Sequence, residues 1–118
     1  INMHPGILPE NRGLDNIKWA IVKNLPQGVT SHLIDSKIDR GKMIIQESIK
    51  VYDDDSLVDV HIRVQNLEQK LMLESIKILE NKNAELIPLG EGTYHKSLPP
   101  EKEQNLLECF ETYKKGNT

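Results

Sequence analysis

The stretch from Ser56 to residue 81 constrains the fold more than any other part of this chain. Its apolar residues recur every three or four positions, as on one face of an α-helix: Leu57, Val60, Val64, Leu67, Leu71, Met72, Ile76 and Leu79. Ser56, with Asp59 three positions later, resembles a capping box, in which two side chains satisfy free amides at a helix start. A coiled coil gives the same pattern, but this stripe is too short for one. We therefore expect a long helix that packs its stripe against a core.

Segments of both secondary-structure types flank this helix. Strands or extended segments are expected at residues 1–4, 29–34, 42–51 and 84–89. Further helices are expected at 15–24 and from 99 to about 115, with loops at 5–13, 35–41 and 90–97. The fold class is therefore α/β, with a mixed sheet, a strand–loop–strand unit, the long packing helix and a C-terminal helix.

Single residues refine these elements. Asp15 is expected to be the N-cap of the first helix. Glu47 interrupts the apolar face of the strand at 42–51 and predicts a bulge or a sheet edge there. The last helix is expected to end at Gly116 and to bury Leu106, Leu107, Phe110 and Tyr113.

The 118 residues fit one domain, and their composition argues against several function classes. The net charge is −3, whereas a generic nucleic-acid binder shows a basic excess. Cys109 is the only cysteine, so no internal disulfide can form. The chain has no apolar run long enough to span a membrane, and we expect a cytoplasmic protein without a membrane partner. We predict no metal, and interpret Asp53 to Asp55 as the start of the long helix.

Three polar side chains have the chemistry of an acyl-transfer site. Asn2 and His4 alternate on an extended segment, so they point to the same side, and Pro5 keeps His4 extended. Asp39 lies in the loop before Gly41. An amide can stabilise an oxyanion, an imidazole can relay a proton, and a carboxylate can orient that imidazole. Residue types alone do not make this set specific.

The sequence motifs around these three residues are more specific than the residue types alone. Asn2-Met-His-Pro-Gly-Ile-Leu-Pro9, Arg12-Gly13, Gly28-Val-Thr30 and Ile38-Asp-Arg-Gly41 resemble, in order and spacing, the folate-dependent formyltransferase family. The resemblance is close over residues 1–64. It implies transfer of a formyl group from 10-formyltetrahydrofolate to an amine. It also implies that residues 1–118 are the C-terminal part of a catalytic domain whose N-terminal half is absent.

Roles for individual residues follow from that resemblance. Asn2, His4 and Asp39 would form the catalytic set. The loop from 34 to 39 would line the pterin site of the folate; its cofactor-binding residues would be Ile34, Asp35 and Ile38. Residues beside the acceptor would be Pro5, Gly6 and Arg12.

The acceptor amine is expected to belong to an amino sugar on a nucleotide. Sugar N-formyltransferases resemble this chain in the words Asn11-Arg-Gly13 and Gly92-Thr-Tyr-His95. Glycinamide ribonucleotide is an alternative acceptor. Methionyl-tRNA is disfavoured because the net charge is negative. A formyltetrahydrofolate hydrolase, a non-catalytic module and a homo-oligomer formed through an open sheet edge remain further alternatives.

The other histidines and the tryptophan have structural interpretations. His32 is expected to be a packed or surface residue of its strand, and Trp19 a core residue of its helix. His61 and His95 have no motif that assigns them a catalytic role.

Overall fold

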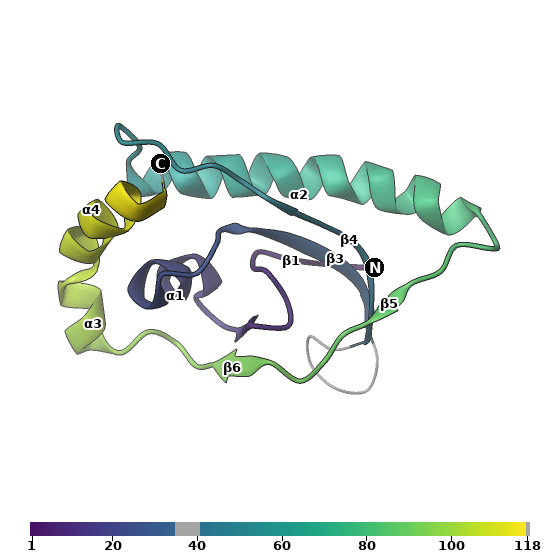
Figure 1. The fold of residues 1–118 in the computed structure, drawn as a ribbon, viewed down its shortest axis with the longest axis horizontal. Coiled ribbons are helices and arrows are strands. Elements are labelled where there is room, and N and C mark those ends of the chain that lie inside the picture. The colour runs from purple at the N-terminus through teal and green to yellow at the C-terminus, as the bar shows by residue number, and fades with distance from the viewer. Residues whose placement is uncertain (35–40, 118) are drawn as a thin grey trace.

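A four-stranded antiparallel sheet lies at the centre of the molecule (Figure 1). The computed structural model describes residues 1–34 and 41–117. The strands lie in the order β1 (Asn2–His4), β3 (Gly28–Ile34), β4 (Gly41–Ser48) and β5 (Ile87–Pro88). The predicted α/β class is confirmed. β4 ends three residues earlier than expected, because Ile49 to Val51 leave the sheet.

The predicted bulge of β4 lies at Ile44 rather than at Glu47, but the alternative, a sheet edge at Glu47, is confirmed: within the described residues, β5 pairs only with Lys42 and Met43 of β4. His32 pairs with Met43 and Ser31 with Ile45, so one residue of β4 has no partner on β3. Such a bulge bends the strand locally. Glu47 stays in register opposite Val29, and its carboxylate contacts Lys70 of the long helix at 3.3 Å. The break in the apolar pattern is thus accommodated by an ion pair.

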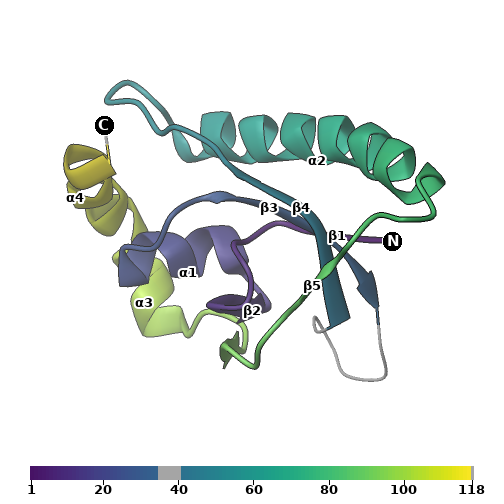
Figure 2. The same cartoon turned by 45° about the vertical axis from the view of Figure 1, so that its right-hand side comes forward.

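The long helix α2 (Leu57–Glu80) covers one face of this sheet (Figures 1 and 2). The predicted capping box is confirmed: Asp59 N–H donates to Ser56 Oγ, and Ser56 N–H donates to Asp59 Oδ2. The face toward the sheet buries Val60, Val64, Leu67, Leu71 and Ser75. Ile76 is exposed, contrary to expectation, because the helical period brings Ser75 toward the sheet, where its hydroxyl lies 2.5 Å from Ser31 Oγ.

Two segments expected to be loops contain short strands. β2 (Asn11–Gly13) and β6 (Thr93–His95) pair in parallel and form a second, two-stranded sheet. Parallel pairing of segments some eighty residues apart requires the chain to return across the molecule. Figure 1 shows this return, from the end of α2 through β5 to β6.

Two helix termini differ from the predictions. Helix α1 (Asn16–Lys23) begins after Asp15, whose φ of 51° is left-handed and whose side chain makes no cap. Asp15 instead accepts a hydrogen bond from Leu98 N–H at 2.8 Å. The expected last helix is divided at Asn105 into α3 (Pro100–Gln104) and α4 (Leu106–Asn117), so Gly116 does not end it.

The core lies between α2, the sheet, α1 and α4, on the two sides of the sheet (Figure 2). The last helix buries Leu106, Phe110 and Tyr113 but leaves Leu107 68% exposed. Lys114 of the same helix is buried, and its ammonium group donates to the carbonyls of Asp53 and Asp55. No helix within the described residues is long and apolar enough to cross a membrane.

Candidate functional site

Strand β1 carries the two predicted catalytic residues that the structure describes. Asn2 and His4 alternate along the strand, and each is paired with a residue of β3: Asn2 with His32, His4 with Thr30. His4 is buried, whereas Asn2 is half-buried. This pairing fixes β1, which carries both side chains, against the inner strand β3.

The side chain of Asn2 is oriented by His32. Its Nδ2 lies 3.1 Å from Nε2 of His32, and Nδ1 of His32 lies 3.3 Å from the Leu33 carbonyl. Because a carbonyl only accepts, Nδ1 of His32 carries the hydrogen and Nε2 accepts one N–H of the amide. The second N–H of Asn2 Nδ2 can then be offered to a ligand.

His32 is fully buried, which confirms its packing on the strand, but its contact with Asn2 was not expected. The register of β1 and β3 decides that contact, and a single sequence does not show which residues are opposite each other. The alternation of Thr30 and His32 on one strand face is the only sequence signal that could have indicated it.

The imidazole of His4 is held by the main chain of Asn11, seven residues further along the chain. His4 Nε2 lies 2.8 Å from the main-chain carbonyl of Asn11. Gly6 lies between them, and a Cβ there would come within 2.9 Å of the Asn11 carbonyl and 3.2 Å of His4 Nε2. Glycine at position 6 therefore permits the close approach of His4 to the Asn11 carbonyl.

The turn after His4 is fastened by Thr30. Its fully buried hydroxyl donates to the Gly6 carbonyl at 2.8 Å and accepts from Leu8 N–H at 3.1 Å. Gln46 of β4 adds bonds of 2.8 Å to the Leu8 carbonyl and 2.9 Å to Thr30 Oγ1. Thr30 and Gln46 thus hold the loop that follows the histidine, a role that the sequence pattern did not reveal for Gln46.

The other two residues predicted to lie beside the acceptor substrate, Pro5 and Arg12, flank this loop. Arg12 of β2 donates to the Glu91 carbonyl and lies 6.0 Å from the ring centre of Tyr94. Pro5 lines a pocket of about 180 Å³ that also contacts Asn16 and His61. The cation of Arg12 is therefore tied to the segment around β6.

Trp19 and His95 form a buried pair. Their rings stack with centroids 4.8 Å apart, and Trp19 Nε1 donates to the Lys96 carbonyl at 2.7 Å. The core interpretation of Trp19 is confirmed. His95 Nδ1 also lies 3.2 Å from Oδ1 of Asn11, so this histidine, which no motif pointed to as catalytic, contacts the residue that holds His4.

The predicted folate-binding segment is described only in part. Asp35, Ile38 and Asp39 lie outside the described residues. Ile34, at the end of β3, is 63% exposed. Strand β3 therefore leads from the buried His32 directly to this segment.

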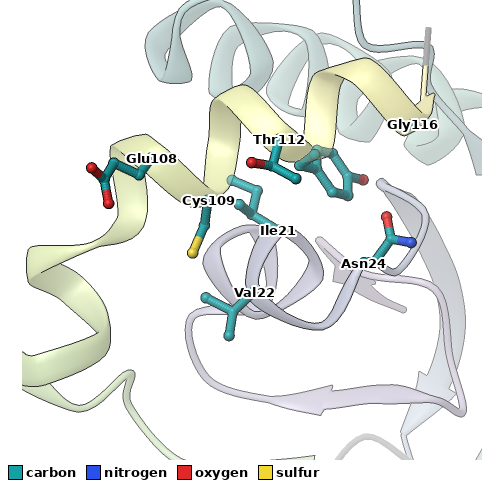
Figure 3. A pocket seen from close by; sticks show the side chains of 8 residues that line it. Ile21, Val22, Asn24, Glu108, Cys109, Thr112 and Gly116 are labelled. Atoms are coloured by element: carbon teal, nitrogen blue, oxygen red, sulfur yellow. The ribbon is translucent and has the colours of Figure 1, made fainter.

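A separate pocket of about 590 Å³ lies between α1 and α4 (Figure 3). Ile21 and Val22 of α1 line it, together with Asn24 directly after that helix, and so do Cys109 and Thr112 of α4. It contains none of the predicted site residues. In the described part of the chain, no group of three or more potential metal-ligating side chains is close enough to bind an ion.

The geometry at β1 fits acyl chemistry. An amide N–H from Asn2 and an imidazole from His4 are presented on one strand, each oriented by a buried partner. Such preorganised donors stabilise charge that develops on an oxygen, and the imidazole can exchange a proton.

Comparisons with known proteins identify the family of this chain. A family model described as "Formyl transferase" matches residues 1–76. The methionyl-tRNA formyltransferase of Flavobacterium johnsoniae is 36% identical over 83 residues, which are 70% of this chain and 26% of that protein. The chain thus spans about a quarter of the length of this curated relative.

Solved structures of the same kind match over more of the chain. The formyltransferase PseJ from Anoxybacillus kamchatkensis, in complex with UDP-4,6-dideoxy-4-formamido-L-AltNAc and tetrahydrofolate, has a TM-score of 0.77 and 32% identity, covering 96% of this chain and 59% of that one. A 4-N formyltransferase from Francisella tularensis has a TM-score of 0.75 and 29% identity, covering 92% of this chain and 51% of that one. On the family match and on these likenesses in sequence and fold, the chain belongs to the formyl transferase family.

Proposed function

We propose that the protein carrying this chain transfers a formyl group from 10-formyltetrahydrofolate to the amine of an amino sugar on a nucleotide. The observation that carries the proposal is the arrangement on β1, where Asn2 and His4 are each oriented by a buried partner. When bound, the folate supplies the formyl group. The residues of the chain bind it, stabilise charge and move a proton.

The family resemblance implies the catalytic roles, and each role suits the chemistry of its side chain. In this transfer the amine would displace the folate nitrogen from the formyl carbon: negative charge would develop on the formyl oxygen as the new bond forms, and the bond to the folate nitrogen would then break. The second N–H of Asn2 donates to that oxygen. His4 takes part in proton transfer as the amine loses its proton. Asp39 orients His4 in its protonated form, in which both ring nitrogens carry hydrogens, and shares in that transfer directly or through water.

Binding roles follow the family resemblance. Ile34, Asp35 and Ile38 contact the pterin of the folate. Pro5, Gly6 and Arg12 lie beside the acceptor. Residues 1–118 are the C-terminal part of the catalytic domain, and the folate site is completed by the part that precedes it in relatives.

The sugar acceptor is supported by the pairing of β2 with β6. This pairing places the words Asn11-Arg-Gly13 and Gly92-Thr-Tyr-His95 side by side, and both words resemble sugar N-formyltransferases. The likeness to PseJ, solved with a nucleotide-linked formamido sugar, points the same way. Methionyl-tRNA is the second candidate acceptor, since a curated relative is named a methionyl-tRNA formyltransferase. Against it, a net charge of −3 does not favour binding to the phosphates of tRNA.

The test is an acceptor screen with the full-length protein. 10-Formyltetrahydrofolate is combined with amino-sugar nucleotides, glycinamide ribonucleotide or charged initiator tRNA, and formylated product is detected by mass spectrometry. We expect product with an amino-sugar nucleotide and its near-complete loss in His4→Ala. Gln65→Ala, an exposed change on α2, serves as the control. Formylation of tRNA alone would overturn the acceptor, and absence of transfer to any amine would favour a non-catalytic module.

A further inference from the structure

The hydrogen bond between His4 and Asn11 restricts which ring nitrogen can exchange a proton. Nε2 of His4 lies 2.8 Å from the Asn11 carbonyl oxygen, and both groups are buried. A carbonyl accepts but never donates, so Nε2 keeps its hydrogen whenever this bond is present. Gain and loss of a proton by His4 then take place at Nδ1.

Asn11 is held by bonds at every polar atom. Its N–H donates to the Ile7 carbonyl at 3.0 Å, and its Nδ2 donates to the Asn16 carbonyl at 2.9 Å. Asn16 returns two bonds of 3.0 Å through Nδ2, one to the carbonyl and one to Oδ1 of Asn11. The side chain of Asn16 therefore fixes the direction of the Asn11 carbonyl that faces His4. Asn16 is itself held in place by its bonds to the side chain of Asn11.

His95 supplies the remaining bond, to Oδ1 of Asn11. Because Oδ1 is an acceptor, Nδ1 of His95 is the donor over their 3.2 Å separation. His95 is buried against Trp19, and burial together with the nearby cation of Lys23 lowers its pKa. A neutral imidazole can keep Nδ1–H for this bond while it stacks on the indole.

We propose that Asn11, held by Asn16 and His95, is a positioning residue that commits proton transfer by His4 to Nδ1. This inference rests on the proposed function of His4. It also gives the β2–β6 pairing a role in catalysis, because His95 on β6 acts on His4 through Asn11 on β2. A wrong tautomer of a catalytic histidine is costly because the lone pair then faces away from the proton it must accept.

Nuclear magnetic resonance of the full-length protein reads the tautomer without substrates. With ¹⁵N-labelled histidine, the His4 resonances are assigned by their loss in His4→Gln. In the neutral form of His4 we expect the ring hydrogen on Nε2 and none on Nδ1. A neutral His4 with its hydrogen on Nδ1 would overturn the proposal, whatever the variants below show.

Two substitutions of His95 separate its donor from its ring. His95→Phe keeps a ring against Trp19 but removes the Nδ1–H donor, whereas His95→Asn retains a donor at that position and loses the ring. We expect kcat to fall roughly tenfold in His95→Phe, with KM for donor and acceptor unchanged and a mixed His4 tautomer. His95→Asn should keep most of kcat. Lys96→Ala, an exposed neighbour, is the control.

The possible outcomes decide between a positioning role and a packing role. Equal losses in both His95 variants, or no loss in His95→Phe, would overturn the proposal, since the donor would then not matter. If His95→Phe does not fold, the tautomer in the wild-type protein still gives the answer. If no amine is formylated but His4 shows the expected tautomer, the proposed function fails while the geometric inference holds.

Discussion

Asn2 Nδ2 and His32 Nε2 lie 3.1 Å apart across the β1–β3 pairing, so a buried histidine orients the half-buried amide of Asn2. His32→Leu removes the acceptor and leaves Asn2 free to rotate. Because Asn2 is proposed to donate to the formyl oxygen, we expect kcat to fall about tenfold or more, as when an oxyanion donor is misplaced. Formyl transfer by the full-length protein measures this effect.

His32→Gln is the matched variant for that prediction. A glutamine places a polar group near the position of Nε2 and can accept from Asn2, so it should recover part of kcat. A thermal unfolding curve accompanies both variants. Wild-type kcat in a folded His32→Leu protein would show that Asn2 needs no such orientation.

Thr30→Val tests the fastening of the loop after His4. The change keeps the shape of the side chain but leaves the Gly6 carbonyl and Leu8 N–H without their buried partner. We expect the free energy of unfolding to fall by about 2 kcal/mol, since an unsatisfied buried polar group costs about 1–3 kcal/mol. Urea unfolding measures it.

The exposed Thr112 on α4 provides the control for the same substitution. Thr112→Val should change the free energy of unfolding by less than about 0.5 kcal/mol. A loss of similar size in both variants would mean that the hydroxyl of Thr30 contributes nothing special.

Gly13→Ala is expected to break the β2–β6 pairing. Gly13 has a φ of +95°, and a Cβ there would lie 2.1 Å from the His95 carbonyl oxygen. Both the left-handed backbone and the clash oppose a side chain, so we expect a loss of about 2 kcal/mol or more in the free energy of unfolding. Gly116→Ala, whose Cβ would meet nothing within 4 Å, should be neutral or slightly stabilising.

The ion pair between Asp55 and Arg63 predicts a loss of stability in acid. Arg63 donates to both carboxylate oxygens at 2.7 and 2.9 Å, and these bonds lower the pKa of Asp55 below 3.8. The unfolded chain therefore takes up this proton first as the pH falls. The contribution of the pair is complete well above pH 3.8 and disappears as the pH falls through the lower, folded-state pKa.

Asp55→Asn should reduce the stability and flatten this part of the stability-against-pH curve. Urea unfolding at a series of acidic pH values measures both. Asp54→Asn removes the same charge from an exposed side chain. A flattening of equal size in both variants would contradict the assignment to the Asp55–Arg63 pair.

Much of the fold follows from local pattern. The stripe and capping box of α2 could be predicted because both depend on residues within a few positions of each other. The failures occurred where a distant partner decides the outcome. Asp15 bonds to Leu98 instead of capping α1, and Ser75 meets Ser31 where Ile76 was expected to pack.

The sequence by itself determined that Asn2 and His4 share one side of an extended segment, because side chains alternate along any strand. Only the tertiary structure decided what orients them. His32 reaches Asn2 through the register of β1 and β3, and Asn11 reaches His4 across a loop closed at Gly6. Such contacts depend on the relative placement of segments far apart in the chain, and one sequence does not contain the distances between them.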